Sequence, residues 1–225
     1  MLQPRWRRWY WRRRGVEASL EKLWVAPPAA RTNWRDADLL VCDAEMSSLD
    51  SKEGELLSLG WVALDSGRIQ LASASHLLLK AKTSVGHSAV IHQLRDCELV
   101  DGLSAPEAMQ QFFDAARGRV LVFHNASLDV AYLNKLCVQH YSAPLCMPYL
   151  CTLRMEQQRL LRRDHPIAPA DLMLAHCRSR YGLPAYTAHN ALCDALATAE
   201  LLLAQASHWG REQGISLGQL GLRYS

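Results

Sequence analysis

Short apolar segments predict a sheet between residues 39 and 123. Leu39–Cys42 and Val120–Phe123 are uninterrupted apolar runs, which are typical of short strands buried on both faces. Residues 55–64 and 68–78 have the composition of two further strands, and Asp65-Ser66-Gly67 between them has the composition of a tight turn. We therefore expect a buried first strand at 39–43, a strand pair over 55–78 and a short strand at 120–123.

Helical signals surround these strands. The clearest helix is expected at residues 105–116, where Ser104 is a suitable N-cap, Pro106 lies in the first turn and Gly118 provides a stop. Another helix should follow strand 120–123, and further helices are expected at residues 15–24, 152–162, 170–181 and 190–208. A Pro/Ala linker at 26–30 suggests three parts, which are an N-terminal arm with linker (1–35), a catalytic domain (36–210) and a C-terminal tail (211–225).

Composition fits one intracellular domain with appendages. The chain has 225 residues and 49% of them are hydrophobic, which is ample for a core. The cysteine count is seven, and the sequence has no Cys-x-x-Cys pair, which argues against a disulfide framework and favours a reducing compartment. No run approaches the ~20 apolar residues of a membrane span, and the Arg-rich start lacks the apolar core of a secretory signal. We expect a cytoplasmic protein with no integral membrane association.

The formal charge of +3 is concentrated at the N-terminus. Residues 1–14 contain six arginines and no acid, so the rest of the chain is near −3. Three tryptophans and a tyrosine are interleaved with these arginines, a composition suited to phosphates and to stacking on bases. The alternatives are a disordered leader, a start codon placed too far upstream, and a cationic amphipathic stretch that touches a membrane surface.

Acidic residues follow the first strand and recur twice later in the chain. Asp43 and Glu45 end that strand, and a strand alternates its side chains, so both should point to the same face. Asp129 ends the segment His124-Asn125-Ala126-Ser127-Leu128-Asp129, and Asp194 ends His189-Asn190-Ala191-Leu192-Cys193-Asp194. Four carboxylates gathered at one edge of a sheet would repel each other strongly unless a cation neutralised them. The pattern therefore predicts a site for hard divalent cations.

The order Asp-x-Glu, His-Asn-Ala-x-x-Asp, His-x4-Asp resembles that of the DEDDh 3′→5′ exonucleases, which include the epsilon subunit of bacterial DNA polymerase III, RNase T and oligoribonuclease. The resemblance runs from about Asp38 to Ala206, and it includes Leu59-Gly60 and residues 91–94. It implies an α/β fold of the RNase H-like type, with a mixed central five-stranded sheet flanked by helices.

The resemblance also implies catalytic roles and two divalent metal ions, Mg²⁺ or Mn²⁺. Asp43 would bridge the two ions, Glu45 and Asp194 would complete the ion that holds the attacking water, and Asp129 would act on the other ion. His189 would be the general base, because a neutral imidazole beside metal-bound water suits that role near pH 7. A sister subfamily has tyrosine where this chain has Asn190, so the sequence is of the histidine type.

Six further positions are candidates for substrate contacts: Ala44, Met46, Ser47, His92, His124 and Asn125. His92 is a candidate for a phosphate or the terminal nucleotide, although it could also be a solvated histidine at a helix start. His124 fits a cap of the strand–helix turn better than catalysis, and Asn125 would orient the loop or touch substrate. The remaining histidines show no spacing of a zinc site.

Three departures from the family pattern leave the substrate open. Family members usually have a pair of hydroxyl residues after the first glutamate, and this chain has Met46-Ser47-Ser48, which keeps the pair only in part. The glycine that commonly precedes the following leucine is replaced by Ser48. The later Asp-Thr-Leu is Cys151-Thr152-Leu153, which lacks the acid. We expect an exonuclease that releases nucleoside 5′-monophosphates from single-stranded DNA 3′ ends, in replication, proofreading or repair.

Two other functions, and the identity of a protein partner, are open at this point. An exoribonuclease of the RNase T/oligoribonuclease type would differ in how it meets the 2′-OH, and a catalytically idle nucleic-acid-binding or polymerase-associated module would need no metal. Gln219-Leu220-Gly221-Leu222 faintly resembles peptides that bind sliding clamps, although Arg223 stands where an apolar residue is expected. A DNA polymerase or a sliding clamp is therefore a candidate partner.

Overall fold

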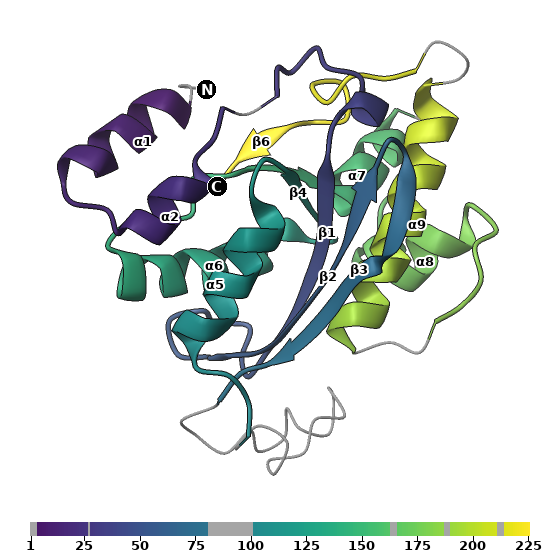
Figure 1. The fold of residues 1–225 in the computed structure, drawn as a ribbon. Helices are drawn as coiled ribbons and strands as arrows, with labels where there is room; N and C mark the ends of the chain where they lie inside the picture. Colours follow the sequence, from purple (N-terminus) through teal and green to yellow (C-terminus); the bar gives the residue numbers. More distant parts are fainter. Residues whose placement is uncertain (1–3, 27, 81–100, 163–165, 187–189, 211–213) are drawn as a thin grey trace.

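The fold is built around a mixed sheet (Figure 1). The computed structural model describes residues 4–26, 28–80, 101–162, 166–186, 190–210 and 214–225. In the sheet order β3-β2-β1-β4-β5-β6, β1, β4 and β5 are parallel and the outer pairings are antiparallel. The strands are β1 Leu39–Met46, β2 Leu56–Asp65, β3 Arg68–Leu78, β4 Val120–Phe123, β5 Pro148–Cys151 and β6 Arg223–Tyr224.

The α/β, RNase H-like expectation is confirmed, with one correction to the strand count. Among the described residues the sheet has six strands in place of five, because residues 223 and 224 return to its edge and pair with Tyr149 and Pro148. β6 contains only two residues. A strand this short has no periodicity that a sequence pattern could reveal.

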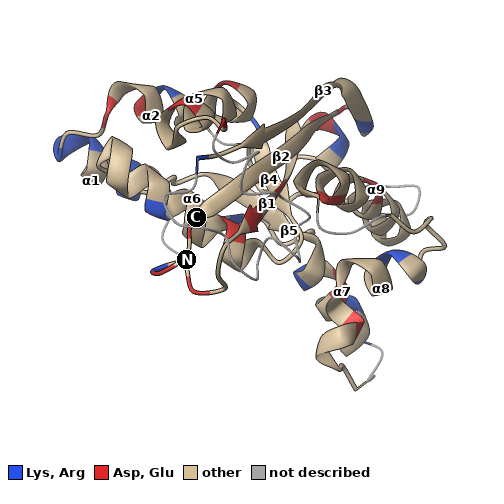
Figure 2. Cartoon of the chain, turned by 90° about the horizontal axis from the view of Figure 1, so that it is seen from below, with Lys and Arg blue, Asp and Glu red and all other residues tan. Residues whose placement is uncertain are grey.

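Helices cover both faces of the sheet (Figures 1 and 2). One core cluster joins the sheet to α2, α5 and α6, and a second joins it to α7, α9 and the C-terminal segment. The helices are α1 Pro4–Arg13, α2 Ala18–Leu23, α5 Ala105–Ala116, α6 Ala126–Tyr141, α7 Thr152–Leu161, α8 Leu174–Ser179 and α9 Ala191–Gly210, with 3₁₀ turns at Trp34–Asp36 and Pro169–Leu172.

The side chains of β1 divide between the two clusters. Leu40, Cys42, Ala44 and Met46 belong to the cluster on the α5/α6 side, whereas Leu39 and Val41 belong to the cluster on the α9 side. Asp43 and Glu45 continue the second row because side chains alternate along a strand. The sequence of β1 therefore directs two carboxylates toward α9.

α5 confirms the expected helix signals in full. Ser104 accepts a hydrogen bond from the Glu107 amide, while the Glu107 carboxylate accepts from the Ser104 amide at 2.9 Å, which makes a capping box. In contrast, the single helix expected at 170–181 is two elements. The backbone of Met173 is extended and separates the 3₁₀ turn Pro169–Leu172 from α8.

The N-terminal arm folds as α1 and is tied to distant parts of the chain. Arg8 is only 5% exposed, and its guanidinium donates to the carbonyl oxygens of Cys146 and Val25. Arg7 donates to the Ser225 carbonyl oxygen. The disordered-leader alternative does not describe residues 4–14, because these contacts hold the helix against the domain. The outer face of α1 carries Trp6 and Trp9, each about half exposed.

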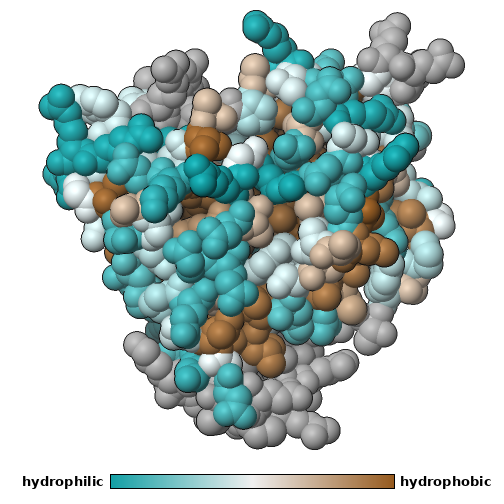
Figure 3. Space-filling model, viewed as in Figure 1, coloured by the Kyte–Doolittle hydropathy of each residue, from teal (hydrophilic) through white to brown (hydrophobic). Residues whose placement is uncertain are grey.

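The C-terminal segment also packs on the domain. Leu217 and Leu220 are buried in the α9-side cluster, and the Gln219 side-chain oxygen accepts hydrogen bonds from Ser216. Within the described ranges, none of the helices has the length and apolar character needed to cross a membrane. On the face drawn in Figure 3, hydrophobic residues form separate patches among hydrophilic ones.

Candidate metal centre

Three of the four predicted carboxylates meet where β1 passes the start of α9. Ligand atoms of Asp43, Glu45 and Asp194 all lie within 4.8 Å of one another. In Figure 2 the acidic segments near the β1 label lie between α6 and α9. Asp194 is in the first turn of α9, which Asn190 caps by accepting the amides of Leu192 and Cys193 at 3.1 Å each. Oxygen ligands at this spacing suit Mg²⁺ or Mn²⁺.

Asp129 adds a fourth carboxylate beside this group. It lies in the first turn of α6, is 4% exposed and accepts a hydrogen bond from the Ala44 backbone amide. Burial raises the pKa of Asp129 to about 8, and the Glu45 charge adds to the effect. Burial also raises the pKa of Asp43 well above its usual range, and the charges of Asp129, Glu45 and Asp194 add to it. Without a cation, ionising these carboxylates together is unfavourable. The arrangement therefore fits a site that divalent cations complete.

Gly60 allows the two halves of the metal centre to meet. It pairs with Asp43 across β1 and β2, and a side chain at this position would run into the backbone of α9, with a Cβ only 2.4 Å from the Leu192 nitrogen. The helix therefore rests directly on the strand, which brings Asp194 toward Asp43. The sequence resemblance included Gly60, but this close approach has no local signal.

His124 is fully engaged in holding the fold. Its Nε2 is 2.9 Å from the Leu172 carbonyl oxygen and must donate to it, so Nδ1 is the acceptor from the Thr152 hydroxyl at 2.8 Å. Burial lowers the His124 pKa to about 4, so the ring is neutral near pH 7. This agrees with the capping role and leaves neither nitrogen open to substrate. Thr152 belongs to the segment that lacks the usual acid.

The other predicted substrate-contacting residues have different surroundings. Ala44 and Met46 are 7% and 8% exposed and pack on the α6 side. The Ser47 hydroxyl accepts from the Glu55 amide at 2.8 Å. Asn125 has a left-handed backbone, with φ of 61°, and its side-chain oxygen accepts from Ser127. Substrate contacts at these four positions stay predictions. The general-base role of His189 and the substrate contact of His92 also stay predictions, because both histidines lie outside the described residues.

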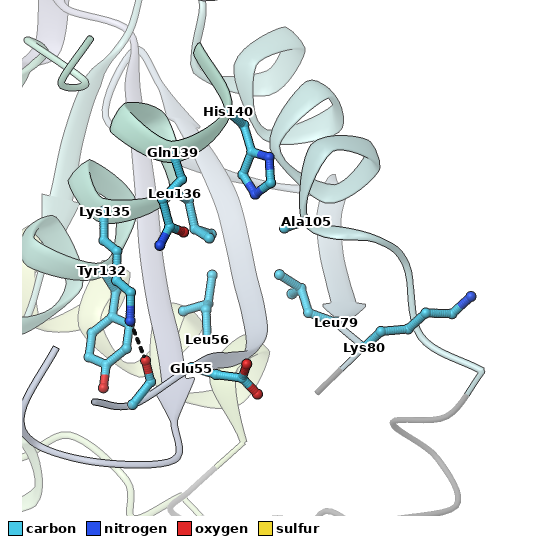
Figure 4. Close-up of a pocket in the computed structure, with 11 residues that line it drawn as sticks. Glu55, Leu56, Leu79, Lys80, Ala105, Tyr132, Lys135, Leu136, Gln139 and His140 are labelled. Carbon is cyan, nitrogen blue, oxygen red and sulfur yellow. Dashed lines mark hydrogen bonds between the residues drawn. The ribbon is translucent and has the colours of Figure 1, made fainter. Parts of the chain in front are cut away.

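A small hollow lies on the α6 side of the sheet (Figure 4). Lys135, Gln139 and His140 from α6 face Leu56, the first residue of β2, and Glu55, which precedes it. Its volume is about 140 Å³, below the roughly 300 Å³ at which ligand pockets begin. The Lys135 ammonium donates to the Gly54 carbonyl oxygen at 2.7 Å, so this lysine braces the loop before β2.

Comparison with known families shows to which family the chain belongs. A family model described as RNase_T, Exonuclease, matches residues 40–202, a span that contains every predicted catalytic residue. The chain belongs to this exonuclease family. Its four acids and the histidine before Asp194 make it a domain of the DEDDh 3′→5′ exonuclease type, related to the epsilon subunit of DNA polymerase III.

Curated relatives include polymerase proteins of very different length. The exonuclease domain is 26% identical over 172 residues to the DNA polymerase III subunit epsilon of Treponema pallidum, covering 76% of the chain and 78% of that protein. It is also 26% identical over 169 residues to the PolC-type DNA polymerase III of Thermotoga maritima, covering 75% of the chain. The match spans only 12% of that polymerase.

Solved structures share the fold at low sequence identity. The nuclease domain of 3′hExo, a DEDDh family member bound to rAMP, matches with a TM-score of 0.65 and 9% identity, covering 82% of this chain and 98% of that one. Exonuclease X in complex with 5′ overhanging duplex DNA matches with a TM-score of 0.60 and 18% identity, covering 81% and 96%. At these identities the likeness establishes the fold alone.

Proposed function

We propose that this exonuclease domain removes nucleotides from the 3′ ends of single-stranded DNA and releases nucleoside 5′-monophosphates. The observation that carries the proposal is the carboxylate group of Asp43, Glu45 and Asp194 within 4.8 Å, with buried Asp129 beside it. DNA is favoured because the curated relatives are DNA polymerase III proteins. Free cysteines at all six described positions agree with a cytoplasmic setting.

Each predicted catalytic residue would have a separate role in phosphodiester hydrolysis. Two bound divalent ions would supply an activated water and stabilise the leaving 3′ oxygen. Asp43 would hold both ions, Glu45 and Asp194 would hold the ion nearer the water, and Asp129 would hold the other. His189 would take the proton from the attacking water. The Ala44 amide fixes the Asp129 carboxylate in place.

An exoribonuclease is the second candidate function. Similar folds include the nuclease domain of 3′hExo bound to rAMP and a 3′-exonuclease that recognises a histone mRNA stem-loop. Association with a DNA polymerase is a further proposal, suggested by the names of the curated relatives. Clamp binding through Gln219–Leu222 would require Leu220, which is 2% exposed, to leave the core.

One set of assays tests these proposals. Purified protein is titrated with Mg²⁺ or Mn²⁺ on end-labelled single-stranded DNA, duplex DNA and RNA of matched sequence. We expect metal-dependent shortening from the 3′ end, fastest on single-stranded DNA, and a loss of several orders of magnitude in Asp43→Ala with the fold retained. Faster cleavage of RNA would favour the second candidate. Near wild-type activity in Asp43→Ala, or no metal-dependent activity in the parent protein, would refute the exonuclease proposal.

A further inference from the structure

An apolar pocket opens beside the metal centre. Its volume is about 360 Å³, within the range of ligand sites, and Asp194 forms part of its wall. The residues that line it are Met173 before α8 and residues of α8, of the segment that follows α8 and of the first turns of α9. Those used below are Met173, Leu183, Pro184, Tyr186, Arg178 and Asp194. The pocket therefore adjoins the predicted metal ligands and extends from them along α8.

Tyr186 is an exposed aromatic that its neighbours hold in place. The residue is 42% exposed, yet its hydroxyl donates to the Glu200 carboxylate at 2.9 Å. The Arg178 guanidinium lies 4.7 Å from the ring centroid and donates to the other Glu200 oxygen at 2.7 Å. A ring that is fixed before binding loses little conformational entropy when a flat ligand stacks on it.

Arg178 forms part of the pocket wall as a buried cation. The side chain is 3% exposed, and its terminal nitrogens donate to the carbonyl oxygens of Ala197 and Pro184 as well as to Glu200. Its Nε–H has no hydrogen-bond partner in the described part of the chain. That nitrogen is itself shielded from solvent, so the fixed ring and the apolar wall define the pocket and this donor does not.

Met173 completes the apolar wall. It is a large hydrophobic residue and yet is 60% exposed, and it lines the same pocket as Asp194. Exposed apolar surface around a fixed aromatic ring is typical of a site for a flat, mainly apolar ligand such as an aromatic heterocycle. Nucleobases have this chemistry, and the adjoining carboxylates act on nucleic acid.

We propose that this pocket takes one unpaired base of the nucleic acid substrate, near its 3′ end. The inference rests on the proposed function, because the pocket and the metal centre share Asp194. A base can enter only after it leaves its stack and its partner, so the pocket favours single-stranded ends over paired ones. Stacking on Tyr186 tolerates any base, since every base has an aromatic face.

The test combines a protein change with a matching substrate change. Oligo-dT strands carry one abasic site at each of the last four positions in turn, and kcat/KM is measured for the parent protein and for Tyr186→Ala. At one position we expect the abasic site to cost the parent roughly 5- to 100-fold, the scale of one stacked base. In Tyr186→Ala the same abasic site should cost almost nothing further, because the contact is already lost.

Two variants and a binding assay complete the design. Tyr186→Phe keeps the ring and should retain the abasic effect, while Leu71→Ala removes an exposed leucine on β3 and should behave as the parent. Affinity for the same strands is measured in Asp43→Ala, where no hydrolysis interferes. If the losses in kcat/KM caused by Tyr186→Ala and by the abasic site multiply at every position, the two changes act independently. That result would overturn the pocket proposal and leave the proposed exonuclease activity unaffected. Absence of any hydrolysis in the parent would instead overturn the proposed function.

Discussion

The backbone of Ala191 lies directly on Gly60, so that a Cβ at residue 60 would stand 2.4 Å from the Ala191 carbonyl carbon. Real Cβ atoms essentially never approach other atoms this closely, so α9 would have to move. Gly60 also pairs with Asp43. One missing side chain therefore sets the distance between the carboxylate on β1 and the carboxylate on α9.

We expect Gly60→Ala to damage the metal centre more than the fold. Displacing α9 moves Asp194 away from Asp43, and misplacement by about 1 Å can cost a reaction roughly 100-fold. Nuclease turnover, the midpoint of Mn²⁺ activation and Tm are measured together. Ala191→Gly should not rescue the variant, because the clash is with backbone atoms. Parent-like Mn²⁺ activation in Gly60→Ala would contradict the prediction.

Stability should depend on pH and metal through Asp129. Its folded pKa of about 8 is above the unfolded value near 3.9, so the folded protein binds a proton that the unfolded chain releases. The metal-free protein should therefore lose stability as pH rises from about 4 to 8, by up to roughly 4 kcal/mol at pH 7. Mn²⁺ should stabilise more at pH 8 than at pH 5, because the ligands must be deprotonated.

Thermal melts at several pH values, with EDTA or Mn²⁺, measure this dependence. Asp129→Asn removes one of the two buried acids whose pKa is raised and should make the metal-free curve less steep, with Asp43 accounting for the dependence that remains. A metal-free parent protein whose Tm rises steadily from pH 5 to 8 would show that other groups dominate.

Much of the fold follows from local signals, whereas its exceptions depend on distant contacts. α5 could be predicted residue by residue, since Ser104, Pro106 and Gly118 act on their immediate neighbours. The packing of α1 could not be predicted in this way, because Arg7 and Arg8 on its inward face bond to distant residues. Except for Val25, their partners lie more than a hundred residues away in the sequence. No periodicity marks an arginine as buried.

The metal centre and its surroundings also contain a part that the sequence predicts and a part that depends on tertiary contacts. Alternation along β1 was enough to place Asp43 and Glu45 on one face, and family order supplied Asp129 and Asp194. The pocket around Tyr186 had no sequence signal, because Arg178 and Glu200 meet the ring only after α8 packs on α9. Contacts of this kind depend on tertiary structure.

His189→Ala should slow hydrolysis by roughly 10²–10⁴-fold while metal and DNA binding persist, because only general-base assistance is lost. Raising the pH should recover part of the rate as hydroxide replaces the base. His124→Ala is the matched control. It removes a partly buried histidine that braces Leu172 and Thr152, so it should lower Tm and leave the pH profile of kcat unchanged. An unaltered pH profile in His189→Ala would assign that histidine another role.

The N-terminal arm should strengthen nucleic-acid binding in a salt-dependent way. Each phosphate contact on a single strand contributes about −0.7 to the slope of log K against log salt. The composition alone allows six contacts, but Arg7 and Arg8 are committed to carbonyl oxygens of the fold. Deleting residues 1–14 should therefore flatten the slope by at most about 3 units, in place of about 4 for six arginines.

Surface variants separate this effect from the loss of α1 packing. Replacing Arg13 and Arg14 by Gln removes two cations that lie over Trp9 and Tyr10 without disturbing Arg7 or Arg8. The slope should flatten by about 1.4 units and KM should rise at moderate salt, while kcat at saturating DNA stays near that of the parent protein, because every predicted catalytic residue lies beyond Asp38. Superimposable salt series for parent and variant would mean that these two arginines do not contact DNA, which would favour a membrane surface or a partner protein as the ligand of α1.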